Sequence, residues 1–489
     1  NLNPKYAEAW NNFKFATRAF QFLNADRNRT GETGTAGLND VARASIGFAI
    51  QQFYLAGFRP HEADKSFEKV ITALPAKAEE AIPIDGPGGQ PAGVFQLADK
   101  IVALLNFGRS GTGLLHSLID GHPEISTLPS IYLRGYFNEG VWDKISAGGW
   151  RELPDRFADE FAVLFDADSP KPIPSRLEEP SFFVGRKEGM TAVGEKRNEK
   201  LSLDRGAFCA EALRLIEGLE TVDPMSFLLI VHAAFERVMG TDTKKPLCFY
   251  HIHNPDEYAK PNFLRYAPDA RLLMAVREPI QNCESSVRTS FKENNYDKAA
   301  HRILQMLFDV DQVAFRMRES VGVRLEDLKT RPEAAMRALC AWLGVEESPS
   351  LYEMTAQGKK WWGDPSSPDY DNTEAMSPFD EASTKRPVGS VFSEKDQLVL
   401  GTLFYPFSVR FGYRDPDPDQ FKKDLIEVRT MIDDMMDFEK AMADRSSIDH
   451  DQFTRNGTYQ LLRAGFVDRW DVLNQFGDYP HMLTPLDIE

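Results

Sequence analysis

Short unbroken apolar runs alternate with longer amphipathic stretches through the middle of the chain. The runs 101–105, 247–250 and 272–276 are typical of strands that are buried on both faces. Apolar residues at helical spacing separate them, above all in 224–239 and 298–318. Strands that alternate with helices predict an α/β fold with a central parallel sheet flanked by helices.

Helical periodicity also marks both ends of the chain. Residues 4–24 and 45–82 predict N-terminal helices, followed by a break rich in proline and glycine at 82–91. Near the other end, 419–445 predicts one helix whose methionine stripe indicates a packing face. The aromatic-rich tail after it has no usable period.

These patterns divide the chain into three parts. We expect a helical N-terminal region over 1–90, a main domain over 95–415 with an insertion at about 141–225, and a C-terminal helical extension and tail over 418–489. Residues 3–13 resemble the junction between two tetratricopeptide repeats, but no second copy follows at the period of about 34 residues. A longer array cut by the start of the sequence and a simple amphipathic helix both remain open. Either would allow a protein partner at the N-terminal helices.

Composition narrows the function classes. The formal net charge of −17 over 489 residues disfavours a general nucleic-acid binder, because neutralising phosphates needs a basic surface. No run reaches the ~18 apolar residues of a membrane span, and no signal peptide is visible. The four cysteines lack the spacing of a zinc site or of a disulfide framework. We therefore expect a cytoplasmic protein with buried thiols.

A glycine loop follows the first apolar run. Gly108-Arg-Ser-Gly-Thr-Gly113 opens a helical segment, so glycines and free helix N–H groups can approach an anion closely. The outer spacing matches a Walker A loop, yet Leu114 and Leu115 stand where that loop has Lys and Ser or Thr. The loop predicts a phosphate site that is not suited to a nucleoside triphosphate with Mg²⁺.

A second anion element follows the run 272–276. Arg277 stands at its end, and Ser285 lies eight residues later inside the next predicted helix. An arginine fork and a hydroxyl at this spacing can converge on one phosphate. Ser286 is a near rival, since the sequence does not fix the register of this helix to within one residue.

Together these two segments resemble the sulfotransferases that use 3′-phosphoadenosine 5′-phosphosulfate (PAPS), which have a P-loop-like sheet. The resemblance spans roughly 95–415 and includes Asp120-Gly-His-Pro-Glu-Ile-Ser126, 323–344 and the late loop 384–392. It implies PAPS as donor, PAP as product and no required metal. The implied 5′-phosphosulfate residues are Arg109, Ser110, Gly111, Thr112, Gly113 and Leu114; the implied 3′-phosphate residues are Arg277 and Ser285, with Lys385 and Arg386 as further nucleotide contacts. Gly113 departs from the family, which usually has a second hydroxyl residue there.

The general base is the open question. In protein-tyrosine members it is a Glu, and the matching position here is Ser130, with Glu139 and Glu124 nearby but out of register. Small-molecule members carry a base His after the strand that matches 247–250, and that position is His253. His251 lies two residues earlier, so both imidazoles are expected to face one pocket. We take His253 as the expected base, because imidazole suits proton abstraction near neutral pH.

The resemblance leads to a sulfotransferase that moves a sulfuryl group to an acceptor hydroxyl or amine, with Arg109 stabilising the leaving group. Carbohydrate, peptide tyrosine and a small hydroxylated metabolite all remain possible acceptors. Two alternatives stay open: a P-loop nucleotide kinase, and a non-catalytic binding protein with a degenerate sulfotransferase domain.

Overall fold

The computed structural model describes residues 81–85, 97–105, 107–129, 133–138, 140–170, 184–241, 243–253, 259–365, 367, 370 and 373–488. The predicted N-terminal helices and the tetratricopeptide-like segment lie outside these residues.

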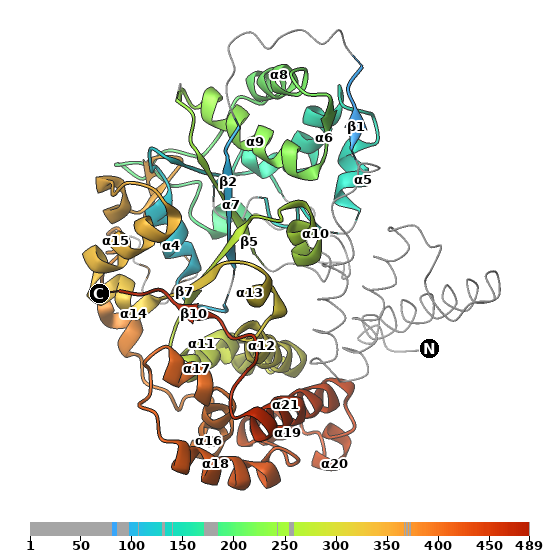
Figure 1. Ribbon diagram of the computed structural model, residues 1–489. Helices are drawn as coiled ribbons and strands as arrows, with labels where there is room; N and C mark the ends of the chain where they lie inside the picture. Colours follow the sequence, from blue (N-terminus) through green and yellow to red (C-terminus); the bar gives the residue numbers. More distant parts are fainter. Residues whose placement is uncertain are drawn as a thin grey trace, which may run out of the picture.

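Six parallel strands form the central sheet, in the order β10-β7-β6-β2-β5-β3 (Figure 1). This arrangement confirms the predicted α/β fold. The strands are β2 (Lys100–Leu105), β3 (Ile125–Thr127), β5 (Leu247–Ile252), β6 (Arg271–Val276), β7 (Ser320–Arg324) and β10 (Thr484–Pro485).

The three predicted strands are the three at the centre of the sheet. β2 pairs with β5 on one side and with β6 on the other, so Leu105 is opposite both Ile252 and Met274. Their side chains are buried on both faces, which explains the unbroken apolar runs. β5 extends two residues past the predicted run and includes His251.

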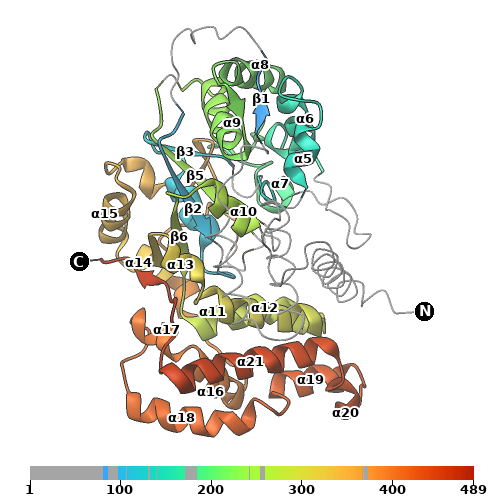
Figure 2. The same cartoon turned by 45° about the vertical axis from the view of Figure 1, so that its right-hand side comes forward.

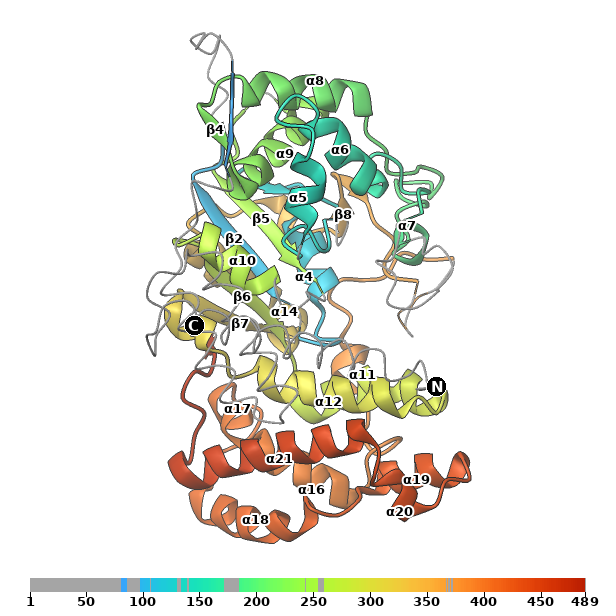
Figure 3. The same ribbon diagram turned by 90° about the vertical axis from the view of Figure 1, so that its right-hand side faces the viewer.

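Helices cover both faces of this sheet, with α4 and α15 on one side and α10 and α13 on the other (Figure 1). Figure 3 shows α4 and α10 beside β2 and β5 from another direction. α11 and α12 pack side by side below the sheet in the view of Figure 1. These helices are α4 (Thr112–Ile119), α10 (Ala259–Tyr266), α11 (Pro279–Lys292), α12 (Tyr296–Asp309), α13 (Val313–Met317), α14 (Leu325–Thr330) and α15 (Pro332–Leu343).

A helical group stands at one end of the molecule, opposite the C-terminal helices (Figure 2). It includes most of the expected insertion and the helix α9 that leads into β5. Its elements are α5 (Val141–Ser146), α6 (Leu153–Glu160), a 3₁₀ turn (Ala162–Leu164), α7 (Val184–Lys187), α8 (Arg205–Ile216), β4 (Thr221–Val222), which pairs with β1 (Ile82–Pro83), and α9 (Pro224–Val238). Along the chain, α15 is followed by a 3₁₀ turn (Pro349–Tyr352), the hairpin β8 (Thr355–Ala356) and β9 (Lys359–Lys360), and a 3₁₀ turn (Glu381–Lys385), before the C-terminal helices begin.

The C-terminal helices differ from the expected single helix over 419–445. The chain forms α18 (Pro418–Met431) and α19 (Asp437–Arg445) with a break between them. The carboxylate of Asp396 caps the start of α19, because it accepts hydrogen bonds from the amides of Asp437 (2.8 Å) and Phe438 (3.0 Å). The other members are α16 (Glu394–Leu403), α17 (Tyr405–Arg410), α20 (His450–Phe453) and α21 (Gly457–Phe476).

The chain returns to the sheet after α21. β10 pairs with β7 in parallel register, and Asp311 bridges to Met482 between α12 and α13. Arg469 of α21 forms a fully buried ion pair with Asp311 at 2.9 Å. Asp311 lies where the predicted helix 298–318 divides into α12 and α13. Within the described part of the chain, none of the helices combines the length and apolar character needed to cross a bilayer.

Candidate functional site

The carboxyl ends of the parallel strands bring the predicted site segments to one edge of the sheet. The glycine loop follows β2, the two histidines end β5, and Arg277 follows β6. Ligands of open α/β sheets bind at this edge. The order of strands places Arg277 on one side of the loop and the histidines on the other.

The glycine loop is shaped to present the start of α4. Gly108 and Gly111 have φ of 54° and 85°, a region that favours glycine. Gly111 is the N-cap of α4; no side chain caps this end, and the first turn carries no acidic residue. The first-turn N–H groups and the positive end of the helix dipole are thus directed at whatever lies beyond the loop, which is the usual geometry of an anion site.

Neighbouring elements hold the loop tightly. The buried hydroxyl of Ser110 donates to the carbonyl of Ala275 in β6 at 2.6 Å. The amide of Asn282 in α11 donates to the carbonyl of Phe107 at 3.0 Å. A Cβ at Gly111 would lie 2.6 Å from Leu325 in α14. The sequence predicted Ser110 as a phosphate contact, whereas in this structure its proton anchors the loop to β6.

Arg277 is buried and faces the late loop. Its guanidinium donates to Gln281 at 2.9 Å and also to the carbonyl of Ser383. Burial lowers the pKa of Arg277, Glu326 opposes that shift, and the positive charge of Arg386 adds to it. The structure therefore brings Arg277 and Arg386 into one neighbourhood. Lys385 instead forms an exposed ion pair with Glu381 at 2.6 Å.

Of the two candidate serines in α11, Ser286 is the one against the glycine loop. Its hydroxyl oxygen lies 2.6 Å from the position of a Cβ on Gly108. Ser285 is half-buried one residue earlier on the same helix. Both serines remain candidates, and the packing places Ser286 nearer to the loop.

Sequence reasoning missed two residues of α11 that organise the late loop. Gln281 donates to the carbonyls of Thr384 (3.2 Å) and Arg386. The buried carboxylate of Glu284 accepts hydrogen bonds from the amides of Gly389 and Ser390 at 2.9 and 3.0 Å. The sequence did contain a signal for these two residues, namely a Gln and a Glu three residues apart on the predicted helix that follows Arg277.

The two predicted histidines lie together. The ring centroids of His251 and His253 are 5.1 Å apart, edge to face, and His116 of α4 stacks on His251 at 5.8 Å. His251 is buried, and neither of its ring nitrogens has a hydrogen-bond partner among the described residues. Burial holds the pKa of His251 well below its usual range. His251 is therefore neutral near pH 7.

His253 stands in a strongly positive environment. Burial, followed by the charges of Arg134, Arg302 and Lys187, lowers the pKa of His253 to about 3. Its imidazole is thus in the unprotonated form that a general base requires. A pKa this low also makes the imidazole a weak proton acceptor.

Of the alternatives to His253 as the base, the structure describes only Glu124. Ser130 and Glu139 lie outside the described residues. The carbonyl of Glu124 accepts a hydrogen bond from Leu247, the first residue of β5, which places Glu124 at the edge of the sheet opposite the glycine loop. Among the described residues, no group of His, Cys, Asp or Glu side chains is arranged to hold a metal ion.

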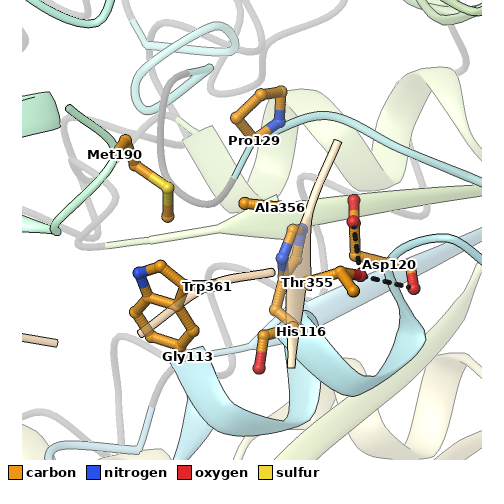
Figure 4. Close-up of a pocket in the computed structure, with 9 residues that line it drawn as sticks. Gly113, His116, Asp120, Pro129, Met190, Thr355, Ala356 and Trp361 are labelled. Atoms are coloured by element: carbon orange, nitrogen blue, oxygen red, sulfur yellow. Dashed lines mark hydrogen bonds between the residues drawn. The ribbon is translucent and has the colours of Figure 1, made fainter. Parts of the chain in front are cut away.

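A small recess lies beside the loop, along one face of α4 (Figure 4). Met190 and Trp361 stand across from Asp120, whose carboxylate accepts a hydrogen bond from Thr355 at 2.8 Å. A Cβ at Gly113 would meet no atom within 4 Å. The glycine that departs from the expected pattern therefore borders open space. The lining residues are Gly113, His116, Ser117, Asp120, Pro129, Met190, Thr355, Ala356 and Trp361.

Comparison with known proteins identifies the family of one part of the chain. Residues 172–349 match the Sulfotransferase family. The chain contains a sulfotransferase-family region. That region includes His253, Arg277 and α11, and it begins after the glycine loop.

Two solved structures also resemble the chain at low similarity. The sulfotransferase domain of a Synechococcus olefin synthase is 14% identical, covers 65% of this chain and 98% of its own, and has a TM-score of 0.32. A sulfotransferase from Mycobacterium avium is 12% identical, covers 68% of this chain and 85% of its own, and has a TM-score of 0.26. No curated protein matches the sequence. None of these likenesses assigns a role to a residue of this chain, so such roles are argued from the geometry of the chain itself.

Substitution by alanine should change the stability of the protein differently at two glycines of the loop. Gly111→Ala should lower the free energy of unfolding by roughly 1–2 kcal/mol or more, since its φ is left-handed and the new methyl meets Leu325. Gly113→Ala should be neutral or slightly stabilising, because open space surrounds that position in a helix. Denaturant midpoints of both variants check this, and equal losses would contradict it.

Acid should destabilise the protein partly through His232 of α9, which is buried against Ser126. Burial is the largest cause that lowers the pKa of His232 to about 3, from 6.5 in an unfolded chain. Below pH 6.5 His232 binds a proton in the unfolded state but not in the folded state, so stability falls as pH drops from about 6.5 towards 3. The loss from His232 should reach about 2 kcal/mol by pH 5.

Melting temperatures at pH 7.5 and 5.5 test this expectation. His232→Asn should have a smaller difference between the two temperatures than the unsubstituted protein, whatever its stability at pH 7.5. The same substitution at the exposed His450 is the matched control. An unchanged difference in His232→Asn would contradict the assignment.

Proposed function

We propose that the protein transfers a sulfuryl group from PAPS to an acceptor hydroxyl or amine, releasing PAP. The observation that carries the proposal is the convergence of three elements at one sheet edge. These are an uncapped helix N-terminus behind a glycine loop without the Walker lysine, a buried arginine on one side of it, and a pair of neutral imidazoles on the other.

In this proposal the loop binds the 5′-phosphosulfate. The N–H groups of Thr112, Gly113 and Leu114 and the hydroxyl of Thr112 bind its oxygens, and Arg109 stabilises the charge that develops on the bridging oxygen. Ser110 keeps the loop on β6 rather than donating to the ligand.

The 3′-phosphate is assigned to the other side of the loop. Arg277 supplies a fork that matches phosphate oxygens, and Arg386 supplies a second positive charge nearby. Ser285 or Ser286 adds a hydroxyl from α11. Arg277 already donates to Ser383, so binding there would rearrange the contact between this arginine and the late loop.

Transfer needs a base at the acceptor oxygen, and we assign this role to His253, with His251 and His116 packed behind it. The acceptor oxygen bonds to sulfur as the bond from sulfur to the bridging oxygen breaks, and the acceptor proton passes to the imidazole. The negative charge of the donor opposes the positive charges that contribute to the low pKa of His253, so donor binding raises that pKa.

Binding measurements test the nucleotide assignment. PAP should raise the melting temperature, whereas ATP with Mg²⁺ should not. Arg277→Ala should weaken PAP binding by about 10–100-fold, the loss expected for charge-assisted hydrogen bonds to a phosphate. Its affinity for adenosine 5′-phosphosulfate, which lacks the 3′-phosphate, should stay unchanged. Equal losses for both ligands would instead indicate a disturbed fold, and full PAP affinity would remove the 3′-phosphate assignment.

The base assignment is tested by turnover. His253→Ala should reduce sulfuryl transfer from PAPS to 4-nitrophenol or water by about 10²–10⁴-fold while leaving PAP affinity nearly intact. His450→Ala, at an exposed position in α20, is the control and should keep full rates. Normal turnover by His253→Ala would return the role to the Glu139 region or to the substrate.

A further inference from the structure

One face of α4 forms a wall of the recess beside the glycine loop. The residues on this face are Gly113, His116, Ser117 and Asp120. They are three or four apart, so His116 is one turn from Gly113 and about 4.5 Å further along the helix axis. In the view of Figure 4 the ring of His116 lies between Trp361 and Asp120. The recess therefore brings His116 close to the residue whose N–H is assigned to the 5′-phosphosulfate.

The carboxylate of Asp120 holds the hairpin of β8 and β9. It accepts hydrogen bonds from the hydroxyl of Thr355 at 2.8 Å and from the amide of Gly358 at 2.9 Å. A third bond comes from the hydroxyl of Thr127 in β3 at 2.7 Å. These bonds fasten the hairpin to the end of α4, so Asp120 and Thr355 shape the recess rather than bind a ligand in it.

Two other polar side chains of the recess also have partners within the protein. The hydroxyl of Ser117 donates to the carbonyl of Leu114 in its own helix at 2.8 Å. The indole N–H of Trp361 donates to the carbonyl of Glu188 at 2.8 Å. Because that N–H is used, the ring of Trp361 presents only apolar surface to the recess.

His116 is the polar side chain of the recess that has no such partner. Its buried ring stacks on His251 at 5.8 Å and packs against Phe249 at 5.9 Å. Among the described residues, none makes a hydrogen bond to its ring nitrogens, and those of His251 are themselves unpartnered. Burial lowers the pKa of His116, and the charge of Asp120 opposes that shift. The neutral ring has one nitrogen that donates and one that accepts, and burial makes leaving them unpaired unfavourable.

The remaining walls of the recess are apolar and carry no positive charge. Pro129, Met190 and Ala356 line it together with Trp361, and none of the described residues that line it is Lys or Arg. An anionic ligand would lose its hydration and meet the carboxylate of Asp120 without a cation to offset the loss. A polyol would leave several hydroxyls without partners against the apolar walls. The recess therefore suits a single hydroxyl on an uncharged, apolar group.

We propose that the acceptor is an uncharged alcohol or phenol with an apolar body, whose hydroxyl enters this recess and is bound by His116. This inference rests on the proposed sulfotransferase function and adds the substrate class to it. The ring of His116 donates to the hydroxyl oxygen and so leaves the hydroxyl proton to the base. His116 thereby positions the acceptor, whereas His253 removes its proton.

Binding to the PAP-saturated protein tests this proposal without requiring turnover. Benzyl alcohol is the probe, and toluene is its matched analogue without the hydroxyl. His116→Phe keeps an aromatic ring but cannot form the hydrogen bond, so it should weaken benzyl alcohol binding by about 3–10-fold, the loss expected for one neutral hydrogen bond. Its affinity for toluene should be unchanged or higher. His450→Phe, at an exposed position in α20, is the control and should leave both affinities unchanged.

Two further measurements separate binding of the hydroxyl from a structural role of the ring. His116→Gln retains a hydrogen-bond donor and should restore most of the affinity for benzyl alcohol. The other measurement needs no variant. 4-(Hydroxymethyl)benzoate, which adds a carboxylate to benzyl alcohol, should bind the unsubstituted protein about tenfold more weakly or worse.

The proposal would be overturned by an unchanged affinity of His116→Phe for benzyl alcohol, by equal losses for benzyl alcohol and toluene, or by an equal loss in His116→Gln. Equal or tighter binding of the carboxylate, or no binding of benzyl alcohol to the unsubstituted protein, would also overturn it. Failure of PAP itself to bind is a separate result, because it would remove the sulfotransferase function on which the proposal rests.

Discussion

The hydrogen bond from Ser110 to the carbonyl of Ala275 ties the glycine loop to the neighbouring strand. Because it is buried at the junction of β2 and β6, it fixes where the N-terminus of α4 points. Leu325 packs against Gly111 from the other side and leaves no room for a side chain there. An anion site made of backbone N–H groups depends on this hydrogen bond and this packing, since such groups bind an anion well only if they are held in position before the ligand arrives.

α11 also holds the segments on the β6 side of the site in position. Asn282 holds the start of the glycine loop through the carbonyl of Phe107. Gln281 donates to carbonyls of the late loop, and Glu284 accepts hydrogen bonds from amides of the same loop. One helix thus positions both segments assigned to the nucleotide. A change in the conformation of the late loop should therefore move the guanidinium of Arg277, because this group donates hydrogen bonds to both Gln281 and the carbonyl of Ser383.

The sheet and its edge were predictable because buried strands leave a simple apolar signature, as β2, β5 and β6 do. β3 and β10 were not, since strands of three and two residues carry no period. α21 was missed for another reason: Arg463 and Arg469 occupy its buried face, where they pair with Glu439 and Asp311. Charged residues on the inner face hide the apolar stripe by which a packed helix is recognised.

Within the site, the residue types were predictable but their partners were not. The sequence identified Ser110 and Arg277, yet the carbonyl groups that accept their hydrogen bonds lie 165 and 106 residues away in the chain. The basic surroundings of His253 come from three elements distant in sequence, so no local motif could indicate them. Such convergence is a property of the fold.

The late return of the chain to the sheet has a consequence for synthesis. β7 has β6 on one side and β10 on the other, and the residues of β10 follow the whole set of C-terminal helices. While the polypeptide is being made, the outer edge of β7 stays uncovered long after β6 and β7 can pair, and an open edge invites pairing with other chains. The ion pair between Arg469 and Asp311 sits where the returning segment meets α12 and α13. Ribosome-bound intermediates of this protein should therefore depend on chaperones until that segment emerges and docks.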